Sequence, residues 1–529
     1  MNRRRFIAGL GTVAAANLTT VAEPRAAASA DPAGAATAEN VWLPWDLWHL
    51  EAAHDVEHAQ GRPRWIEDAV YADHVDDGLA SWPTVYRDEA SGKWRMFHSS
   101  QWKPYRLHVA ESDDGVHFRP TTVRDVAPED GQVAPNHVFT LSHGSAGAVY
   151  VDPVAADGYR FKAFAHRQQD PVFARAKDDP THRWHAIAKE GKSQRYFNEE
   201  LLLVSRDGLR WEVRLDRSWG LPDWHPEPPI FGFYNPRTGR HAMTVRPGWG
   251  DRRVCLQTTT DFRAWSGPEM LLHPDPLDGL TEHYGMPVFP YGGGFVGFPW
   301  IFHCVNTQAT GFNRFIGGLD AQLAYSYDGV RFHRGLRRPF VERNEPGRPG
   351  GGAVQPSCLV EAGDELRIFS ASSKVQHGRR VAAREAGETA TGAVLVHTLR
   401  RDGFMLLRNA GGWGEMLTKP LALFDATLRT NVRAPHGEMQ WQVTDLERRP
   451  VEGYTFADFM PLERIDGVEL PLRWKDRTLE PLLNRVVRLH MRLRDAEFYA
   501  LRGRFHFLDA QDAWMLADGR TIDTRRFDH

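Results

Sequence analysis

A short turn motif, Ser-x-Asp-Gly-x-x-aromatic, recurs along the chain and sets the strongest limit on its fold. Clear copies begin at Ser112, Ser205 and Ser326, and degenerate copies occupy 260–265 and 401–404. Aspartate followed by glycine between two alternating apolar runs is the strongest short-range hairpin signal, because a type I′ turn needs positive φ at both central residues. Each copy is therefore predicted to be a tight turn between strands.

A second repeated unit alternates with the first. It consists of an apolar strand, a polar turn containing glycine, and another strand ending in aromatic or β-branched residues. The turn glycines are Gly92, Gly158, Gly239, Gly293 and Gly363. Two hairpins make a four-stranded meander, which cannot bury both faces alone, whereas several such sheets packed radially can. The chain is therefore predicted to be all-β, with a five-bladed β-propeller over 65–410.

Insertions and a second domain decorate this ring. The largest insertion, roughly 167–199, is predicted to form a loop over one face. Beyond the propeller, runs such as 468–474 and 486–493 mostly alternate with period two and are separated by turns, a pattern typical of an antiparallel sandwich. We expect a C-terminal β-sandwich over 411–512, followed by a tail over 513–529.

The first 30 residues have the features of an export signal. Arginines at positions 3–5 precede a short apolar stretch, and a small-residue triplet occupies 28–30. These features are typical of a cleaved signal peptide of the twin-arginine (Tat) type. A membrane anchor is the alternative, although the apolar run is shorter than the ~20 residues of a span. We predict a periplasmic or secreted protein without membrane contact after cleavage, in which 31–64 leads into the propeller.

The charge and the cysteine content limit which partners and which cross-links the chain can have. The formal net charge is −3, and the predicted leader carries more arginine than acidic residues, so the mature chain is more acidic still. No basic run remains, which argues against nucleic acid as a partner. Cys255, Cys304 and Cys358 are too few and too scattered for a disulfide framework or a CxxC metal motif, although one pair could bridge.

Polar residues just before each innermost strand are the candidate site, because these strands line the central channel of a propeller and their ends converge at its mouth. In blade order the positions are Asp76 and Asp77, Asn136 and His143, Asp223 and Glu227, Glu282 and His283, and Gln355. Carboxylates beside aromatic rings suit glycoside hydrolysis, in which one acid protonates the leaving oxygen and the other activates water or attacks the anomeric carbon. A carbohydrate substrate is therefore predicted.

Other side chains near these positions are predicted to contact the substrate. Tryptophan can stack on a sugar face, and histidine, arginine and glutamine can hydrogen-bond its hydroxyl groups. The predicted substrate-binding residues are Trp82, Trp224, His143, His283, Arg246 and Gln355.

A metal site is the competing interpretation of the many histidines. His54 and His58 are four residues apart, near His49 and Glu51, and histidines at that spacing can chelate a metal. No recognisable metal motif surrounds them, so no cofactor and no catalytic metal is predicted. The sequence leaves open whether a structural divalent cation binds in the propeller channel.

The repeat pattern resembles the five-bladed propeller glycosidases of families 32, 43, 68 and 130, many of which carry a C-terminal β-sandwich. The segment 258–266 is similar to their S-x-D-x-x-x-W turns, and 227–230 looks like the E-x-P-x segment that holds the general acid of family 43. The resemblance implies an exported glycoside hydrolase acting on a plant or microbial glycan, with a furanoside among the candidates and Glu227 as the acid.

The sequence also departs from these families. The Asp-Pro that supplies the family 43 base is missing, since Trp82 precedes Pro83, and the W-x-N-D-P-N box of family 32 is absent. Asp77 is then the nearest candidate base, with Asp223 and Glu282 as alternatives.

Two other functions stay open. A non-catalytic carbohydrate-binding or scaffold propeller is favoured by the missing Asp-Pro. A mannoside phosphorylase like those of family 130 would need a basic phosphate pocket, which Arg246, Arg252 and Arg253 could form.

Overall fold

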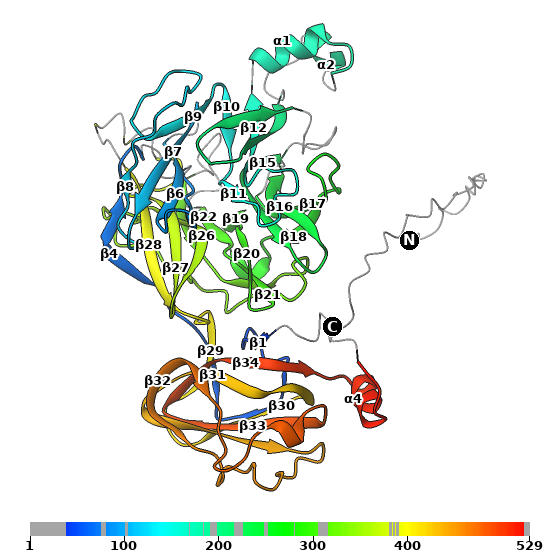
Figure 1. The fold of residues 1–529 in the computed structure, drawn as a ribbon. Helices are drawn as coiled ribbons and strands as arrows, with labels where there is room; N and C mark the ends of the chain where they lie inside the picture. Colours follow the sequence, from blue (N-terminus) through cyan, green and yellow to red (C-terminus); the bar gives the residue numbers. More distant parts are fainter. Residues whose placement is uncertain are drawn as a thin grey trace, which may run out of the picture.

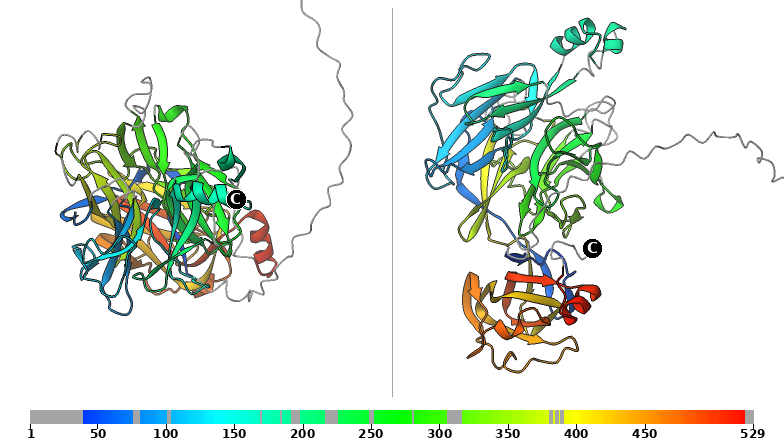
Figure 2. Two further views of the ribbon diagram at one scale, coloured as in Figure 1. Left: turned by 90° about the horizontal axis from the view of Figure 1, so that it is seen from above. Right: turned by 45° about the vertical axis from the view of Figure 1, so that its right-hand side comes forward.

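The structure, a computed structural model, is almost entirely β, and its sheets are arranged around a ring in the manner of propeller blades (Figure 1). It describes residues 39–75, 81–100, 104–168, 170–182, 185–190, 198–215, 226–247, 252–279, 281–304, 316–379, 383, 387 and 391–522. Two further views show the ring above a second, smaller β body (Figure 2). The predicted all-β propeller fold is confirmed.

Within the described residues, the strands of the ring follow one another as antiparallel four-stranded meanders. The first meander is β5 (Thr84–Arg87), β6 (Trp94–Ser99), β7 (Tyr105–Ser112) and β8 (Arg119–Pro120), with β9 (His137–Leu141) beside β7. The second is β10 (Gly144–Ala146), β12 (Phe161–Gln168), β13 (Asn198–Ser205) and β14 (Trp211–Arg214), with β11 (Tyr150–Val151) beside β12. The third is β15 (Pro226–Asn235), β16 (Arg240–Pro247), β17 (Val254–Thr259) and β18 (Glu269–Leu272). The fourth is β20 (Val288–Tyr291), β21 (Gly294–Gly297), β24 (Ala324–Ser326) and β25 (His333–Arg334), and the fifth is β26 (Ala353–Ala362), β27 (Glu365–Ser373), β28 (Gly392–Arg400) and β4 (Arg64–Tyr71).

Pairing of β4 with β28 closes the ring, because it joins a strand from the beginning of the chain to the last meander. A ribbon of β19 (Thr281–Gly285), β22 (Trp300–Cys304) and β23 (Gly317–Ala321) extends the same sheet through a parallel pairing of β23 with β26. The 3-10 helix η3 (Pro276–Asp278) precedes this ribbon. The innermost strands therefore come from separate sheets and surround a common channel.

The Asp-Gly motifs form turns whose geometry differs from the type I′ turn that was predicted. Only the glycine has positive φ, 79° at Gly208, while the Asp207 carboxylate accepts hydrogen bonds of 2.9 Å from the backbone N–H groups of Leu209 and Arg210. The degenerate copy at 260–265 keeps this arrangement, with Phe262 at φ 60° in the place of glycine. The aspartate stabilises the turn by capping it and does not adopt positive φ itself.

Substitution Asp207→Ala should lower the free energy of unfolding by about 1 kcal/mol, the usual cost of losing a side chain that caps backbone N–H groups. Urea unfolding followed by circular dichroism measures the loss. Asp476→Ala, which alters an exposed aspartate, should leave stability unchanged, and an equal loss in both variants would contradict the capping role.

The copy of the motif at 401–404 was predicted to be a tight turn between strands of one sheet, but it does not close a hairpin in its own sheet. Asp402 itself has φ 63°, and the chain continues into β29 (Met405–Asn409), which pairs with strands of the second body. The reason is that β4 already occupies the edge of β28 where a returning strand would pair.

The second body is built from both ends of the chain. Its described strands are joined by hydrogen bonds into one nine-stranded sheet that surrounds a core containing Trp441 and Trp474. The strands are β1 (Asn40–Trp42), β2 (Leu50–His54), β3 (Glu57–Gln60), β29, β30 (Gly414–Thr418), β31 (Leu421–Thr444), β32 (Leu462–Pro471), β33 (Val486–Arg494) and β34 (Ala496–Phe507). The segment predicted as a lead-in thus supplies three strands here. The 3-10 helix η5 (Glu480–Leu482) precedes β33, and α4 (Ala510–Ala517) follows β34.

Buried polar contacts join the ring to the second body. Asp402 is 1% exposed and accepts hydrogen bonds from Tyr291 Oη (2.8 Å) and Asn431 Nδ2 (3.0 Å), and it forms an ion pair with Arg502 of β34. The two bodies are therefore linked through a charged group that has little access to solvent.

The largest insertion contains helices where a loop had been predicted. In its described parts, α1 (Asp170–Asp178) and α2 (His185–Lys189) project from one end of the ring (Figure 1). Val172, Ala176 and Ala188 bury a small apolar contact between them. No helix in the described part of the chain is long and apolar enough to cross a membrane.

Candidate functional site

Four of the candidate site residues, Asp76, Asp77, Asp223 and Trp224, lie outside the described residues. The others can be placed. Glu227 belongs to β15, the innermost strand of the third meander, where its backbone lies opposite Arg246 of β16.

Two of the predicted carboxylate residues lie on strands that pack closely together. Strand β19, which carries Glu282, lies against β15, which carries Glu227. The approach is close because Gly285 has no side chain: a Cβ at this position would come 2.3 Å from a ring carbon of Pro229. Sequence reasoning had selected both carboxylates but had no means of showing that their strands are neighbours.

Two arginines lie over the ring of Tyr284, which belongs to β19. The guanidinium carbon of Arg246 lies 4.7 Å from the ring centroid of Tyr284, and that of Arg252 lies 5.3 Å from it. Arg252 also forms an ion pair with Glu282. We call Arg246, Arg252, Glu282 and Tyr284 the mouth cluster.

The mouth cluster combines a carboxylate, two cations and an aromatic ring in a largely buried setting. Arg246 and Arg252 are 6% and 8% exposed, and Tyr284 Oη shares a hydrogen bond of 3.0 Å with His377 Nε2. Because a guanidinium group only donates hydrogen bonds, the Glu282 oxygen that pairs with it is an acceptor. This arrangement suits a carboxylate that acts while ionised, as a base or a nucleophile must.

Trp82 and Gln355, both predicted to contact substrate, are buried in the core of the ring. Trp82 is 3% exposed, packs against Phe231 and Trp300, and donates from Nε1 to Gln355 Oε1 at 3.3 Å. The Trp82 ring therefore contacts protein in this structure, where a stacking platform would need an open face.

The two predicted histidines differ in accessibility. His143 is exposed in the turn between β9 and β10 and has φ 56°. His283 is fully buried, and neither ring nitrogen has a hydrogen-bond partner among the described residues. Burial lowers the pKa of His283 to about 4, so the ring is neutral at pH 7. His143 keeps the access that a substrate contact needs, and His283 does not.

A row of stacked histidines in the first meander was missed by sequence reasoning. Ring centroids are 5.5 Å apart for His74 and His108, 5.4 Å for His98 and His108, and 5.0 Å for His108 and His137. Burial lowers the pKa of His98 to about 3 and that of His108 to about 2. Alternation of His98 and His108 with apolar residues on paired strands was the available signal, but it does not reveal burial.

This row predicts acid sensitivity. The unfolded chain binds protons at His98 and His108 near pH 6.5 and the folded chain does not, so stability is greatest above that pH and falls as the pH drops toward the folded pKa values. His98→Leu should reduce the slope of unfolding free energy against pH by about 1 kcal/mol per pH unit between pH 6 and 4. Urea unfolding at several pH values measures it. His436→Leu, at an exposed site, should leave the slope unchanged, and equal slopes in wild type and His98→Leu would refute the prediction.

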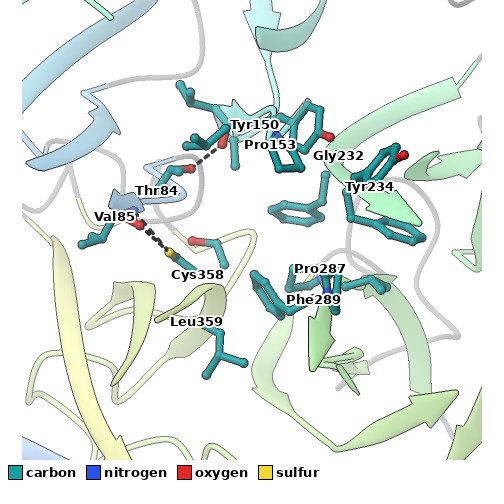
Figure 3. Close-up of a pocket in the computed structure, with 18 of the residues that line it drawn as sticks. Thr84, Val85, Tyr150, Pro153, Gly232, Tyr234, Pro287, Phe289, Cys358 and Leu359 are labelled. Carbon is teal, nitrogen blue, oxygen red and sulfur yellow. Dashed lines mark hydrogen bonds between the residues drawn. The ribbon is translucent and has the colours of Figure 1, made fainter. Parts of the chain in front are cut away.

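The channel contains an apolar cavity of about 480 Å³ (Figure 3). Residues of every meander line it, among them Val85, Tyr150, Phe231, Phe289 and Leu359. Its polar groups are satisfied within the protein: the Thr84 hydroxyl donates to the Val149 carbonyl at 2.7 Å, and the Ser357 hydroxyl donates to the Pro83 carbonyl at 2.7 Å. Among the described residues that line this cavity there is no acidic residue and none of the predicted site residues.

Metal ligands are not gathered in the described part of the chain, where no three or more His, Cys, Asp or Glu side chains are grouped to hold an ion. Two members of the candidate metal-ligand set around His54 make contacts with other protein groups. Glu51 forms ion pairs with Arg448 and Arg488, and His58 Nε2 shares a hydrogen bond of 2.8 Å with the Pro44 carbonyl. The three cysteines are free thiols.

Neither a protein-family model nor a curated protein matches this chain. Among solved structures, it is similar to a thermostable family-43 glycoside hydrolase (12% identity, TM-score 0.37, covering 61% of this chain and 91% of that one). It is also similar to a GH32 β-fructofuranosidase from Bombyx mori (12% identity, TM-score 0.37, covering 84% of this chain and 93% of that one). A third similar structure is a β-1,2-mannobiose phosphorylase from Listeria innocua (11% identity, TM-score 0.38, covering 65% of this chain and 97% of that one). Identity this low assigns no role to any residue, and the chain's own strands place it among all-β propeller-type proteins.

Proposed function

We propose that this chain is an exported glycoside hydrolase with a five-bladed propeller, acting on a plant or microbial glycan. The observation that supports this function is the juxtaposition at the mouth, where the strand carrying Glu227 packs against the strand carrying Glu282. The buried arginines Arg246 and Arg252 lie against Tyr284, which is on the same strand as Glu282. Hydrolysis of a glycosidic bond needs two carboxyl groups with different protonation states, on opposite sides of the bond.

In the proposed mechanism, Glu227 donates a proton to the leaving oxygen. Glu282, an acceptor in its pair with Arg252, serves as the base or nucleophile, with Asp77 and Asp223 as the other candidates for that role. Arg246 and Arg252 would orient sugar hydroxyl groups, because guanidinium groups donate in fixed directions. Tyr284 would hold the two guanidinium groups in place through its cation–π contacts with them.

The test is a screen of aryl glycosides and polysaccharides, including furanosides, with and without inorganic phosphate. The proposal expects release of reducing sugar that does not require phosphate. A chain that cleaves none of the glycans it binds would overturn the hydrolase proposal.

A phosphorylase is the second candidate, and the two buried arginines favour it because they could hold a phosphate ion. It is distinguished by the product: cleavage would require phosphate and release a sugar 1-phosphate. The pairing of Arg252 with Glu282 opposes this alternative, since it neutralises one of the two cations.

A non-catalytic carbohydrate-binding propeller is the third candidate, and the acid-free cavity in the channel favours it. It predicts saturable glycan binding that calorimetry detects, without product at long incubation times and without any effect of substitutions at Glu227 or Glu282.

A further inference from the structure

A second pocket, polar and positively charged, lies between the meander that closes the ring and the segment 338–344. Its volume is about 290 Å³. Gln60, at the end of β3, and Trp65, on β4, line one side, and His397 of β28 lies beside Trp65 in the paired strands. None of its lining residues belongs to the mouth cluster. We call it the arginine pocket.

Three residues that line the arginine pocket carry buried polar atoms without partners. Gln60 Oε1, Trp65 Nε1 and His397 Nδ1 have no hydrogen-bond partner among the described residues, and Gln60 and His397 are 8% and 3% exposed. Gln60 Nε2 is satisfied, since it donates to the Pro339 carbonyl at 3.0 Å. A buried polar group left unpaired is destabilising, so each such atom calls for a partner that the described residues do not supply.

These atoms form a mixed set of donors and acceptors. Trp65 Nε1 can only donate and Gln60 Oε1 can only accept. Burial lowers the pKa of His397 to about 4, so its imidazole is neutral at pH 7 and offers one donor and one acceptor. A ligand with several hydroxyl groups satisfies such a set, because each hydroxyl group both donates and accepts.

The rim is basic. Arg62, Arg338 and Arg343 line the pocket and are exposed, and among the lining residues that the structure describes only Glu342 is acidic. Arg343 Nε lies 3.9 Å from an Asp320 carboxylate oxygen, and Arg338 interacts electrostatically with Glu57. A guanidinium group matches a carboxylate with two parallel hydrogen bonds.

We propose that the arginine pocket binds a hexuronic acid residue, with the hydroxyl groups at Gln60, Trp65 and His397 and the carboxylate at Arg62 or Arg338. The volume lies at the small end of the range for ligand pockets, which suits a single sugar unit. This site goes beyond the proposed hydrolase activity: it would hold an acidic sugar away from the mouth, whichever reaction occurs there.

The experiment is isothermal titration calorimetry of the full chain with D-galacturonate and D-glucuronate, compared with galactose and glucose. Saturable binding of at least one uronate, at least tenfold tighter than its neutral counterpart, is expected, because hydrogen bonds between charged groups are stronger than those between neutral groups. Arg338→Glu should weaken that binding at least tenfold, since it places a negative charge at an exposed rim position without disturbing the core.

Matched controls separate this pocket from the mouth and from general charge effects. Arg124→Glu makes the same change at an exposed arginine outside both cavities and should leave uronate binding unchanged. Gln60→Leu should weaken binding of the sugar but not of acetate, which has the carboxylate alone. The proposal is overturned if no uronate binds saturably, if the neutral sugars bind as tightly, or if Arg338→Glu has no effect. It is overturned equally if Glu227→Gln abolishes the binding, which would place the sugar at the mouth.

Discussion

Glu227→Gln is expected to lower kcat/KM by about 10²–10⁴-fold on natural glycans that the chain cleaves, the usual contribution of a general acid. Glutamine keeps the size and hydrogen-bonding shape of glutamate but has no proton to donate. Because Glu227 lies on a strand whose register with β16 is set by backbone pairing, the substitution should leave the melting temperature unchanged. Initial rates and thermal unfolding on the same preparations measure both quantities.

The leaving group shows whether Glu227 acts as an acid. An activated aryl glycoside needs little protonation of its leaving oxygen, so Glu227→Gln should retain much more activity on a dinitrophenyl glycoside than on an alkyl glycoside or a polysaccharide. If Glu227 were instead the base or nucleophile, both substrates would lose activity together. Glu365→Gln, at an exposed position on β27, is the matched control, and full activity of Glu227→Gln on every glycan would end its assignment.

Arg502→Met is expected to lower the free energy of unfolding by about 3–5 kcal/mol, because it leaves a buried carboxylate without its countercharge. Asp402 would keep only the neutral donors Tyr291 and Asn431, and it is 1% exposed. The loss should appear as a separated transition in calorimetry, since these contacts join the ring to the second body. Limited proteolysis should then cut first near the junction.

A neutral partner should rescue this defect. In the Arg502→Met background, Asp402→Asn removes the uncompensated charge and is expected to restore part of the lost stability, so the two substitutions should be non-additive. Arg494→Met, which breaks an ion pair with Glu438 at a half-exposed arginine, should cost no more than about 1 kcal/mol. If Arg502→Met cost as little as this control, the buried pair would not hold the bodies together.

Much of the ring could be predicted from local pattern. The apolar runs around Gly92, Gly158, Gly239, Gly293 and Gly363 all pair as hairpins in the structure, because strand alternation and turn residues are local signals. The closing strand β4 and the strands β1–β3 were not recognised as members of distant sheets. Their partners lie more than 300 residues away in the sequence, and no local pattern encodes such a pairing.

The candidate site likewise has features that could be predicted from the sequence and features that could not. Glu227 and Glu282 could be selected because each precedes or begins a predicted strand at the mouth. The burial of Trp82 and His283, the row of stacked histidines and the arginine pocket could not be predicted, because exposure depends on what packs from other blades.

The repeated Ser-x-Asp-Gly turns, together with the hairpins that alternate with them, therefore determined that this chain forms short antiparallel strands in four-stranded units. An aspartate that caps its own backbone acts within three or four residues, so the information is local. The tertiary structure alone decided that the copy at Asp402 leaves the ring and becomes the buried charge joining two bodies. The reason is that its partners, Tyr291, Asn431 and Arg502, come from three distant strands, and only folding brings them to one carboxylate.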